Sequence, residues 1–144
     1  MGPVGYRELY SGTGSVAGRT DWLIVVHTRD AWRRIAPSLR AQRDLAELRF
    51  DWARSVALLV QAPPQGSSAD SFHVRSISAT DAGVEVLVEL AQARTGAGPA
   101  LGTPVLKPSL IVAEAEASAF GESVPVQLVL PGIKPPPSAV AHER

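Results

Sequence analysis

The sequence predicts an α+β fold that is mainly β: a twisted antiparallel sheet, or an open barrel or sandwich, with one or two helices packed on it. Residues 84–90 place four aliphatic side chains on one face and Glu85 and Glu89 on the other, the pattern of a half-buried strand. Two further runs, 22–27 and 56–60, are almost continuously apolar, as is typical of strands buried on both faces. Loops rich in Gly, Pro and Ser are expected between these strands.

The size and composition of the chain indicate one domain. The chain has 144 residues, of which 45% are hydrophobic and 19% charged, so it can bury a core and is too apolar for a disordered protein. We expect a flexible N-terminal segment over residues 1–20, a single domain over residues 21–131, and a disordered, proline-rich tail over residues 132–144.

The first half of the chain predicts strands and a helix. A short strand is expected near Tyr6–Tyr10, followed by a flexible loop over residues 11–19. Thr28 is typical of a helix N-cap, and it precedes an apolar helical stripe. The stripe consists of Trp32, Ile35, Ala36 and Leu39. Pro37 is expected to kink this helix or to start a new one, because it lacks the backbone N–H, and residues 38–48 remain compatible with a helix.

The second half of the chain predicts a hairpin and further strands. Strands are expected over residues 56–60, 72–78, 84–91, 105–114 and 124–130, with loops or turns over 62–71, 79–83, 92–103 and 115–122. Asp81 and Gly83 supply the chemistry of a short hairpin turn. Pro108 interrupts the predicted strand over 105–114, so this strand is expected at a sheet edge or with a bulge.

Charge and cysteine content bound the kinds of site that the chain can hold. The formal net charge is +0, which gives no overall attraction to nucleic acid or acidic lipid. Residues 1–54 nevertheless hold nine arginines against six acidic residues, a mild asymmetry. The absence of cysteine excludes disulfides, thiolate nucleophiles and cysteine-based zinc sites.

Neither a membrane span nor a leader is predicted. No apolar run approaches the roughly 20 residues that a spanning helix needs. The N-terminus lacks a basic region followed by an apolar segment, so it does not resemble a signal peptide. We expect a cytoplasmic protein if Met1 is the native start, and a protein of the cell envelope if a leader has been removed.

No motif predicts a catalytic residue, a cofactor or a metal site. The glycine-rich run 12–18 resembles a phosphate loop, but a predicted strand follows where that mechanism needs a helix, so a flexible loop is favoured. His27, His73 and His142 have no spacing that brings metal ligands together. A small hydrolase with a triad assembled across strands stays an alternative, because triads are defined by geometry; no nucleophile-elbow motif supports it.

The arginines between Arg29 and Arg54 offer a second alternative, a basic stripe that binds nucleic acid. Base stacking would need aromatic partners, for which the candidates are Trp22, Trp32 and Trp52. Trp32 lies on the apolar helical stripe and Trp22 adjoins a buried strand, so both are interpreted as core residues. Nucleic acid is therefore not the favoured partner.

The segment 62–71 is the favoured functional candidate, because long loops on rigid scaffolds often carry binding residues. It is small and polar, and it lies between two well-defined predicted strands. A plain surface loop is an equally good interpretation. The residues assigned to a candidate protein-binding loop are Gly66, Ser67, Ser68, Asp70 and Phe72.

Three short stretches carry a family resemblance. Residues 25–32 are a strand followed by a helix that bears a tryptophan, 51–60 are Asp-Trp followed by an apolar strand, and 104–114 are a strand interrupted by proline. In this order they resemble the PrcB C-terminal domain family, named after a subunit of a bacterial surface protease complex, over residues 22–130. The family usually has a Thr-Gly-Gly-Tyr turn before its third strand, where this chain has Ala69-Asp70-Ser71-Phe72 and lacks both glycines.

The resemblance implies a non-catalytic, mainly β domain that binds another protein as an accessory or regulatory subunit of a protease complex. We therefore expect a protein-binding domain and no enzyme, with another protein, such as a protease, as the partner. Binding is expected from the two Gly/Pro loops or from an exposed strand edge near Val105–Val112. The missing glycine pair weakens any inherited role of the loop before residue 72.

Overall fold

The fold is given by a computed structural model that describes residues 2–61, 69–92, 109–130, 134–136 and 138–144. Its strands are β1 (Tyr6–Val16), β2 (Leu23–Val26), β3 (Leu39–Ala41), β4 (Ser55–Gln61), β5 (Ala69–Thr80), β6 (Gly83–Gln92), β7 (Ser109–Glu116), β8 (Val126–Val129) and β9 (Val140–Glu143). Its helical elements are α1 (Arg29–Ile35) and two 3-10 turns, η1 (Ala36–Ser38) and η2 (Ala117–Ala119).

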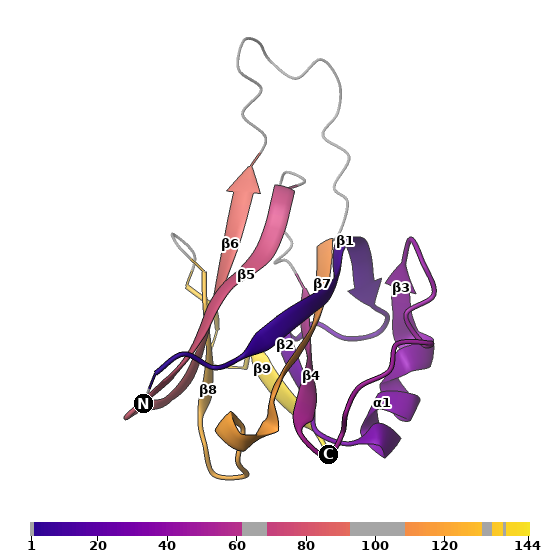
Figure 1. The fold of residues 1–144 in the computed structure, drawn as a ribbon. Helices are drawn as coiled ribbons and strands as arrows, with labels where there is room; N and C mark the ends of the chain where they lie inside the picture. Colours follow the sequence, from indigo (N-terminus) through magenta and orange to yellow (C-terminus); the bar gives the residue numbers. More distant parts are fainter. Residues whose placement is uncertain (1, 62–68, 93–108, 131–133, 137) are drawn as a thin grey trace.

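The strands form two sheets, and the predicted mainly β fold is confirmed. One sheet has six strands in the order β3-β1-β7-β4-β2-β9, and the other has three in the order β5-β6-β8. Each sheet contains one parallel pair, β2 with β9 and β6 with β8, so both are mixed and neither closes into a barrel. Figure 1 shows three layers: β5, β6 and β8 on the left, the larger sheet in the middle, and α1 on the right.

The centre of the six-stranded sheet is buried on both faces. Side chains of β2, β4 and β7 that point to one face, such as Leu58, pack against the three-stranded sheet. Their neighbours that point to the other face, such as Leu59, pack under α1 and the chain before β4. The continuous apolar runs predicted as doubly buried strands are thus confirmed, since every residue of β2 is buried and Val56 to Val60 are buried as well.

The hairpin formed by β5 and β6 has the predicted alternation. The three valines of β6 are buried between the sheets, whereas its two glutamates are exposed. Gly83 closes the turn with φ of +130°, a conformation that L side chains rarely adopt. A Cβ at this position would also lie 2.2 Å from the carbonyl oxygen of Pro125, so the turn requires glycine.

Strand β1 corrects the predicted flexible N-terminal segment. Residues 11–16, expected as a loop, continue the strand that begins at Tyr6 and pair with β7 and β3. Gly14 packs so closely on β3 that a Cβ would lie 2.5 Å from the carbonyl oxygen of Arg40. Gly14 therefore serves close strand packing, which the sequence pattern alone does not distinguish from loop flexibility.

The residues before and within β1 also bind the edge of β5. The Val4 N–H donates to the Ile77 carbonyl over 2.8 Å, and the Tyr6 hydroxyl donates to the Val74 carbonyl over 2.9 Å. In Figure 1 the N-terminal part of β1 lies beside β5, and the chain then runs into the larger sheet. This segment links the two sheets, and it covers part of an edge that would otherwise expose unpaired backbone groups.

The helix begins and ends as the sequence indicates. The Thr28 Oγ1 accepts from the Ala31 N–H over 3.1 Å, which confirms the predicted N-cap. Pro37 lies in the first turn of η1, so a new helical start replaces the continuous helix, as expected. The helix considered for residues 38–48 is wrong, because residues 39–41 form β3 and pair with β1 in the sheet.

The predicted edge strand is also wrong. Strand β7 is the third of six and pairs on both sides, with β1 and with β4, so it is an internal strand. Its first residue is Ser109, and residues 105–108 lie outside the described residues. Pro108, and with it the bulge predicted there as the alternative, lies outside the described residues.

The predicted disordered C-terminal tail contains an ordered strand. Residues 140–143 form β9, which pairs in parallel with β2 from Leu23↔Val140 to Val26↔Glu143. The preceding Ala139 is buried, and its carbonyl accepts from the N–H groups of Trp22 and Leu23 over 2.8 and 3.0 Å. The sequence did not predict this strand for two reasons. The segment is rich in proline, and its pairing partner is more than 110 residues away in the sequence.

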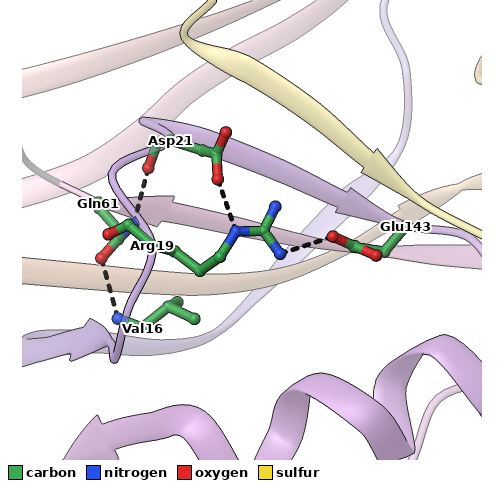
Figure 2. A network of polar contacts seen from close by, with 5 residues as sticks. All are labelled: Val16, Arg19, Asp21, Gln61 and Glu143. Atoms are coloured by element: carbon green, nitrogen blue, oxygen red, sulfur yellow. Dashed lines mark hydrogen bonds and ion pairs between the residues drawn. The ribbon is translucent and has the colours of Figure 1, made fainter.

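A polar network fixes β9 to the rest of the sheet (Figure 2). The Arg19 guanidinium donates to the carboxylate of Asp21 over 2.7 Å and to that of Glu143 over 2.6 Å. Gln61 accepts from the Val16 N–H over 2.9 Å and donates to the Asp21 carbonyl over 2.7 Å. The network thus joins the ends of β1 and β4, the residues before β2, and β9.

The valines of β6 allow a direct test of the two-sheet packing. Val86→Asp is expected to unfold the domain, because Val86 is fully buried between the sheets and the new carboxylate would have no partner there. We expect a loss of more than about 4 kcal/mol, measured by urea unfolding followed by circular dichroism. Glu85→Gln on the exposed face is the control, with a change within about 0.5 kcal/mol. Native-like stability of the Val86 variant would contradict the packing described.

Candidate functional site

A groove of about 410 Å³ lies between α1 and the chain that leads to β4. It is lined by Arg29, Trp32, Arg33, Ala46, Leu48, Arg49, Phe50 and Trp52. We call this site the arginine-rimmed groove, because aromatic side chains line it and its charged lining residues are all arginines. It lies on the face of the six-stranded sheet that is opposite the β5-β6-β8 layer.

The aromatic lining is fixed by packing. The rings of Trp32 and Phe50 meet edge to face with centroids 4.8 Å apart, and those of Phe50 and Trp52 are 5.0 Å apart. The exposed fractions of Trp32 and Phe50 are 4% and 8%, whereas Trp52 is half-buried. Aromatic pairs of this kind contribute about 0.5–1.5 kcal/mol each beyond the area that they bury, so the groove is preformed.

The indole nitrogen of Trp32 has an unusual environment. Its Nε1 is buried and has no hydrogen-bond partner within the described part of the chain. Most buried donors in proteins are satisfied, and an unsatisfied one costs about 1–3 kcal/mol. Trp32 lines the groove, and its buried indole nitrogen has no acceptor among the residues that the structure describes.

The three arginines of the groove also lack partners in the part of the chain that the structure describes. Arg29, Arg33 and Arg49 are exposed, and none has an ion pair or hydrogen bond with the residues that the structure describes. Other arginines are engaged: Arg7 with Glu114, Arg19 with Asp21 and Glu143, Arg40 with Pro37 and Leu39, Arg43 with Leu9, and Arg75 with Glu89. Arg54, which lies outside the groove, is also exposed and its side chain has no partner among the described residues, but three such arginines line this one groove.

The position of the groove arginines on the helix gives a further observation. Arg33 lies in the last turn of α1, where the helix dipole favours a cation. Arg29 is the first residue of the helix, where the dipole disfavours one. Helix electrostatics therefore accounts for Arg33 and does not account for Arg29.

A smaller groove of about 140 Å³ lies beside the polar network of Figure 2. It is lined by Ala17, Arg19, Ala31, Arg34, Ile35, Ser38 and Glu143. Its Arg19 and Glu143 pair with each other, and Arg34 donates to the Arg144 carbonyl over 2.7 Å. These charges are used within the fold, so this groove is a structural junction between α1, β1 and β9.

The predicted protein-binding loop lies mostly outside the described residues. This holds for Gly66, Ser67 and Ser68. Asp70 and Phe72 belong to β5, which begins at residue 69, so the expected loop over 62–71 is shorter at its C-terminal end. The loop assignment stays a prediction for residues 62–68.

The three histidines do not meet at one site. His27 and His142 form a pair, with Nε2 and Nδ1 2.9 Å apart and the rings stacked at 5.2 Å. His73 lies instead in β5, where its Nδ1 is 2.9 Å from a carboxylate oxygen of Glu8. None of the three lines either groove. Within the described residues, no group of three or more His, Asp or Glu side chains is placed to hold a metal ion.

The three tryptophans are divided between the two faces of the larger sheet. Trp32 and Trp52 belong to the arginine-rimmed groove, whereas Trp22 packs on the core between the sheets. Trp32 is a core residue, as expected, and it is also part of the groove lining. Sequence reasoning missed Phe50, although the Phe50-Asp51-Trp52 spacing, which places two aromatic side chains around one acidic residue, was an available signal.

Comparisons with models of protein families, with curated proteins and with solved structures found no match for this chain. In the part of the chain that the structure describes, none of the helices has the length and apolar character that a bilayer crossing demands. The site must therefore be interpreted from its own geometry and chemistry.

The histidine pair predicts a pH-dependent stability. Burial, with smaller contributions from Arg144 and His142, lowers the pKa of His27 to about 4, and burial also lowers the pKa of His142. An unfolded histidine binds a proton near pH 6.5, so between these values the unfolded chain binds more protons than the folded one. The free energy of unfolding should therefore be highest above about pH 6.5 and should decrease as the pH falls towards about 4.

The double variant His27→Asn, His142→Asn isolates this effect, because asparagine does not titrate. Between about pH 7.5 and about pH 5, the wild type should lose about 1 kcal/mol more stability than the variant, a value reduced for the partial exposure of both rings. Urea unfolding at each pH measures the difference. Parallel stability curves for the two proteins would contradict the assignment.

Proposed function

We propose that this chain is a non-catalytic domain that binds another protein through the arginine-rimmed groove, as an accessory or regulatory subunit of a protease complex. The association with a protease comes from the resemblance to the PrcB C-terminal domain family. The binding surface comes from the groove, whose lining offers aromatic contact area and unpaired positive charge.

One observation carries the proposal: arginines that have no partner among the described residues line a groove beside a buried aromatic cluster. Tryptophan and arginine are among the residues that contribute most to protein–protein affinity, and energetically important contacts gather around well-packed pockets. Here Arg29, Arg33 and Arg49 line the groove beside such a cluster, and the fold gives them no ion pair within the described residues.

The rigidity of the groove supports the same interpretation. Trp32 and Phe50 are nearly fully buried, so their rotamers are fixed before any partner arrives. Binding to a preformed surface loses less conformational entropy than binding to a mobile one, which improves affinity for a given contact area. The six-stranded sheet beneath the cluster provides this support.

The lining chemistry favours binding over catalysis at this groove. Its side chains are arginine, alanine, leucine, phenylalanine and tryptophan, which include no general base and no nucleophile at neutral pH. Nucleic acid is also less favoured, because single strands need several exposed aromatic faces in a row. Only Trp52 among the groove aromatics is half-exposed.

Charge reversal in the groove tests the proposal. The variant Arg29→Glu, Arg33→Glu, Arg49→Glu should keep its melting temperature within a few degrees, since these side chains are exposed and unpaired. It should lose more than about tenfold in partner recovery, in line with removal of several interface hot spots. The measurement is quantitative mass spectrometry of proteins that co-purify from the source cells.

The matched control is the variant Arg7→Glu, Arg54→Glu, Arg75→Glu, which changes the net charge equally on exposed arginines outside the groove. This control should retain the partner and should lose little stability, because surface ion pairs are worth about 0–1 kcal/mol. Equal recovery of the same partner by both triple variants and the wild type would refute the groove as the binding surface. Absence of any protease among the partners would refute the protease association.

The loop predicted from the sequence enters the same experiment. Replacement of Ser67 and Ser68 by alanine is expected to leave the melting temperature nearly unchanged and to weaken partner recovery, as polar loop residues contribute to contacts more than to folding. Differential scanning fluorimetry and the co-purification assay measure the two effects. Unfolding of this variant would contradict the division between scaffold and loop.

A further inference from the structure

We infer that the arginine-rimmed groove receives an acidic segment of its protein partner, with side-chain carboxylates on the arginines and an apolar side chain against the aromatic cluster. This inference rests on the proposed protein-binding function and adds the chemistry of the partner. It follows from the charge, the hydrogen-bonding state and the size of the groove.

The charge of the groove is complementary to carboxylates. Three guanidinium groups line it, and no acidic side chain does. Because the whole chain has a formal net charge of +0, this positive charge is a local feature and not a consequence of composition. Guanidinium groups bind carboxylates with paired, charge-assisted hydrogen bonds, which makes an acidic partner the natural complement.

The Trp32 indole gives a second, independent indication. Its N–H can only donate, it is buried, and it lacks an acceptor within the described residues. Trp32 lines the groove, so a partner that shifts this side chain enough to expose the N–H could offer it a carboxylate or carbonyl oxygen as acceptor. The free energy lost by the unsatisfied N–H in the free protein would then be recovered on binding.

The size and lining of the groove favour a short peptide segment. Its volume of about 410 Å³ lies within the range of sites that enclose a small-molecule-sized group. The half-buried Leu48 and Trp52 offer apolar contact for one aliphatic side chain, and the three arginines line the same groove. A phosphate backbone would use the arginines and leave this apolar lining without a role.

Titration with defined peptides tests the inference. The probe is the capped peptide Glu-Glu-Leu-Glu-Glu, added to ¹⁵N-labelled protein and followed by nuclear magnetic resonance. The chain has three tryptophans, so its three indole N–H signals can be assigned with single Trp→Phe variants. We expect the indole signals of Trp32 and Trp52, which line the groove, to shift and to saturate, and the Trp22 signal, on the opposite face of the sheet, to stay unchanged.

The controls separate specific from general attraction. The peptides Gln-Gln-Leu-Gln-Gln and Lys-Lys-Leu-Lys-Lys should cause no saturable shift, and the triple variant Arg29→Glu, Arg33→Glu, Arg49→Glu should bind the acidic peptide more than about tenfold more weakly. Raising the salt concentration should also weaken binding, because exposed charges are screened over about 10 Å at 0.1 M. The matched variant Arg7→Glu, Arg54→Glu, Arg75→Glu should bind like the wild type.

Defined outcomes would overturn the inference. These are no saturable shift with the acidic peptide, equal binding of the glutamine peptide, or tighter binding of a short oligothymidylate than of the acidic peptide. Trp32→Phe should weaken the binding of the acidic peptide several-fold. If this variant fails to fold, the indole shift of the wild type alone tests the inference. If the peptide fails while the cellular partner still requires the groove arginines, the acidic segment is wrong and the proposed function stands.

Discussion

The burial of both faces of β2, β4 and β7 is the constraint on which the rest of the structure depends. A strand with two buried faces needs a covering layer on each side, and the chain provides the β5-β6-β8 sheet on one side and α1 with the segment before β4 on the other. The second covering layer creates the arginine-rimmed groove, because Trp32 and Phe50 must pack there to seal the sheet. The candidate site is thus an outer margin of the hydrophobic core.

The ends of the chain close this structure. The residues before and within β1 bind the edge of β5, and β9 covers the edge of β2, held by backbone pairing and by the Arg19 network. Both contacts provide hydrogen-bond partners for backbone groups that exposed strand edges would leave unpaired. The fold therefore uses two segments whose composition is typical of loops, the glycine-rich run in β1 and the proline-rich region that leads to β9.

The charged side chains divide into two groups with different physical roles. Arg19 and Arg75, for example, are paired with acidic residues and belong to the fold's own surface. Arg29, Arg33 and Arg49 line a groove beside an aromatic cluster and have no partners in the described residues, where the buried indole N–H of Trp32 also has no acceptor. Natural sequences are usually locally consistent, and departures from consistency tend to mark function. This contrast is why the groove, and not the smaller network beside β9, supports a proposal.

The sequence by itself determined the local elements: the doubly buried strands, the alternation of β6, the Thr28 cap and the turn at Gly83. These follow from side-chain period and backbone chemistry, which act over a few residues. Only the tertiary structure decided the role of the glycine-rich run in β1, the internal place of β7 and the pairing of β9. It also brought Arg29 and Arg33 to Arg49 and Phe50. Those outcomes depend on contacts between residues far apart in the chain, which leave no periodic signal in one sequence.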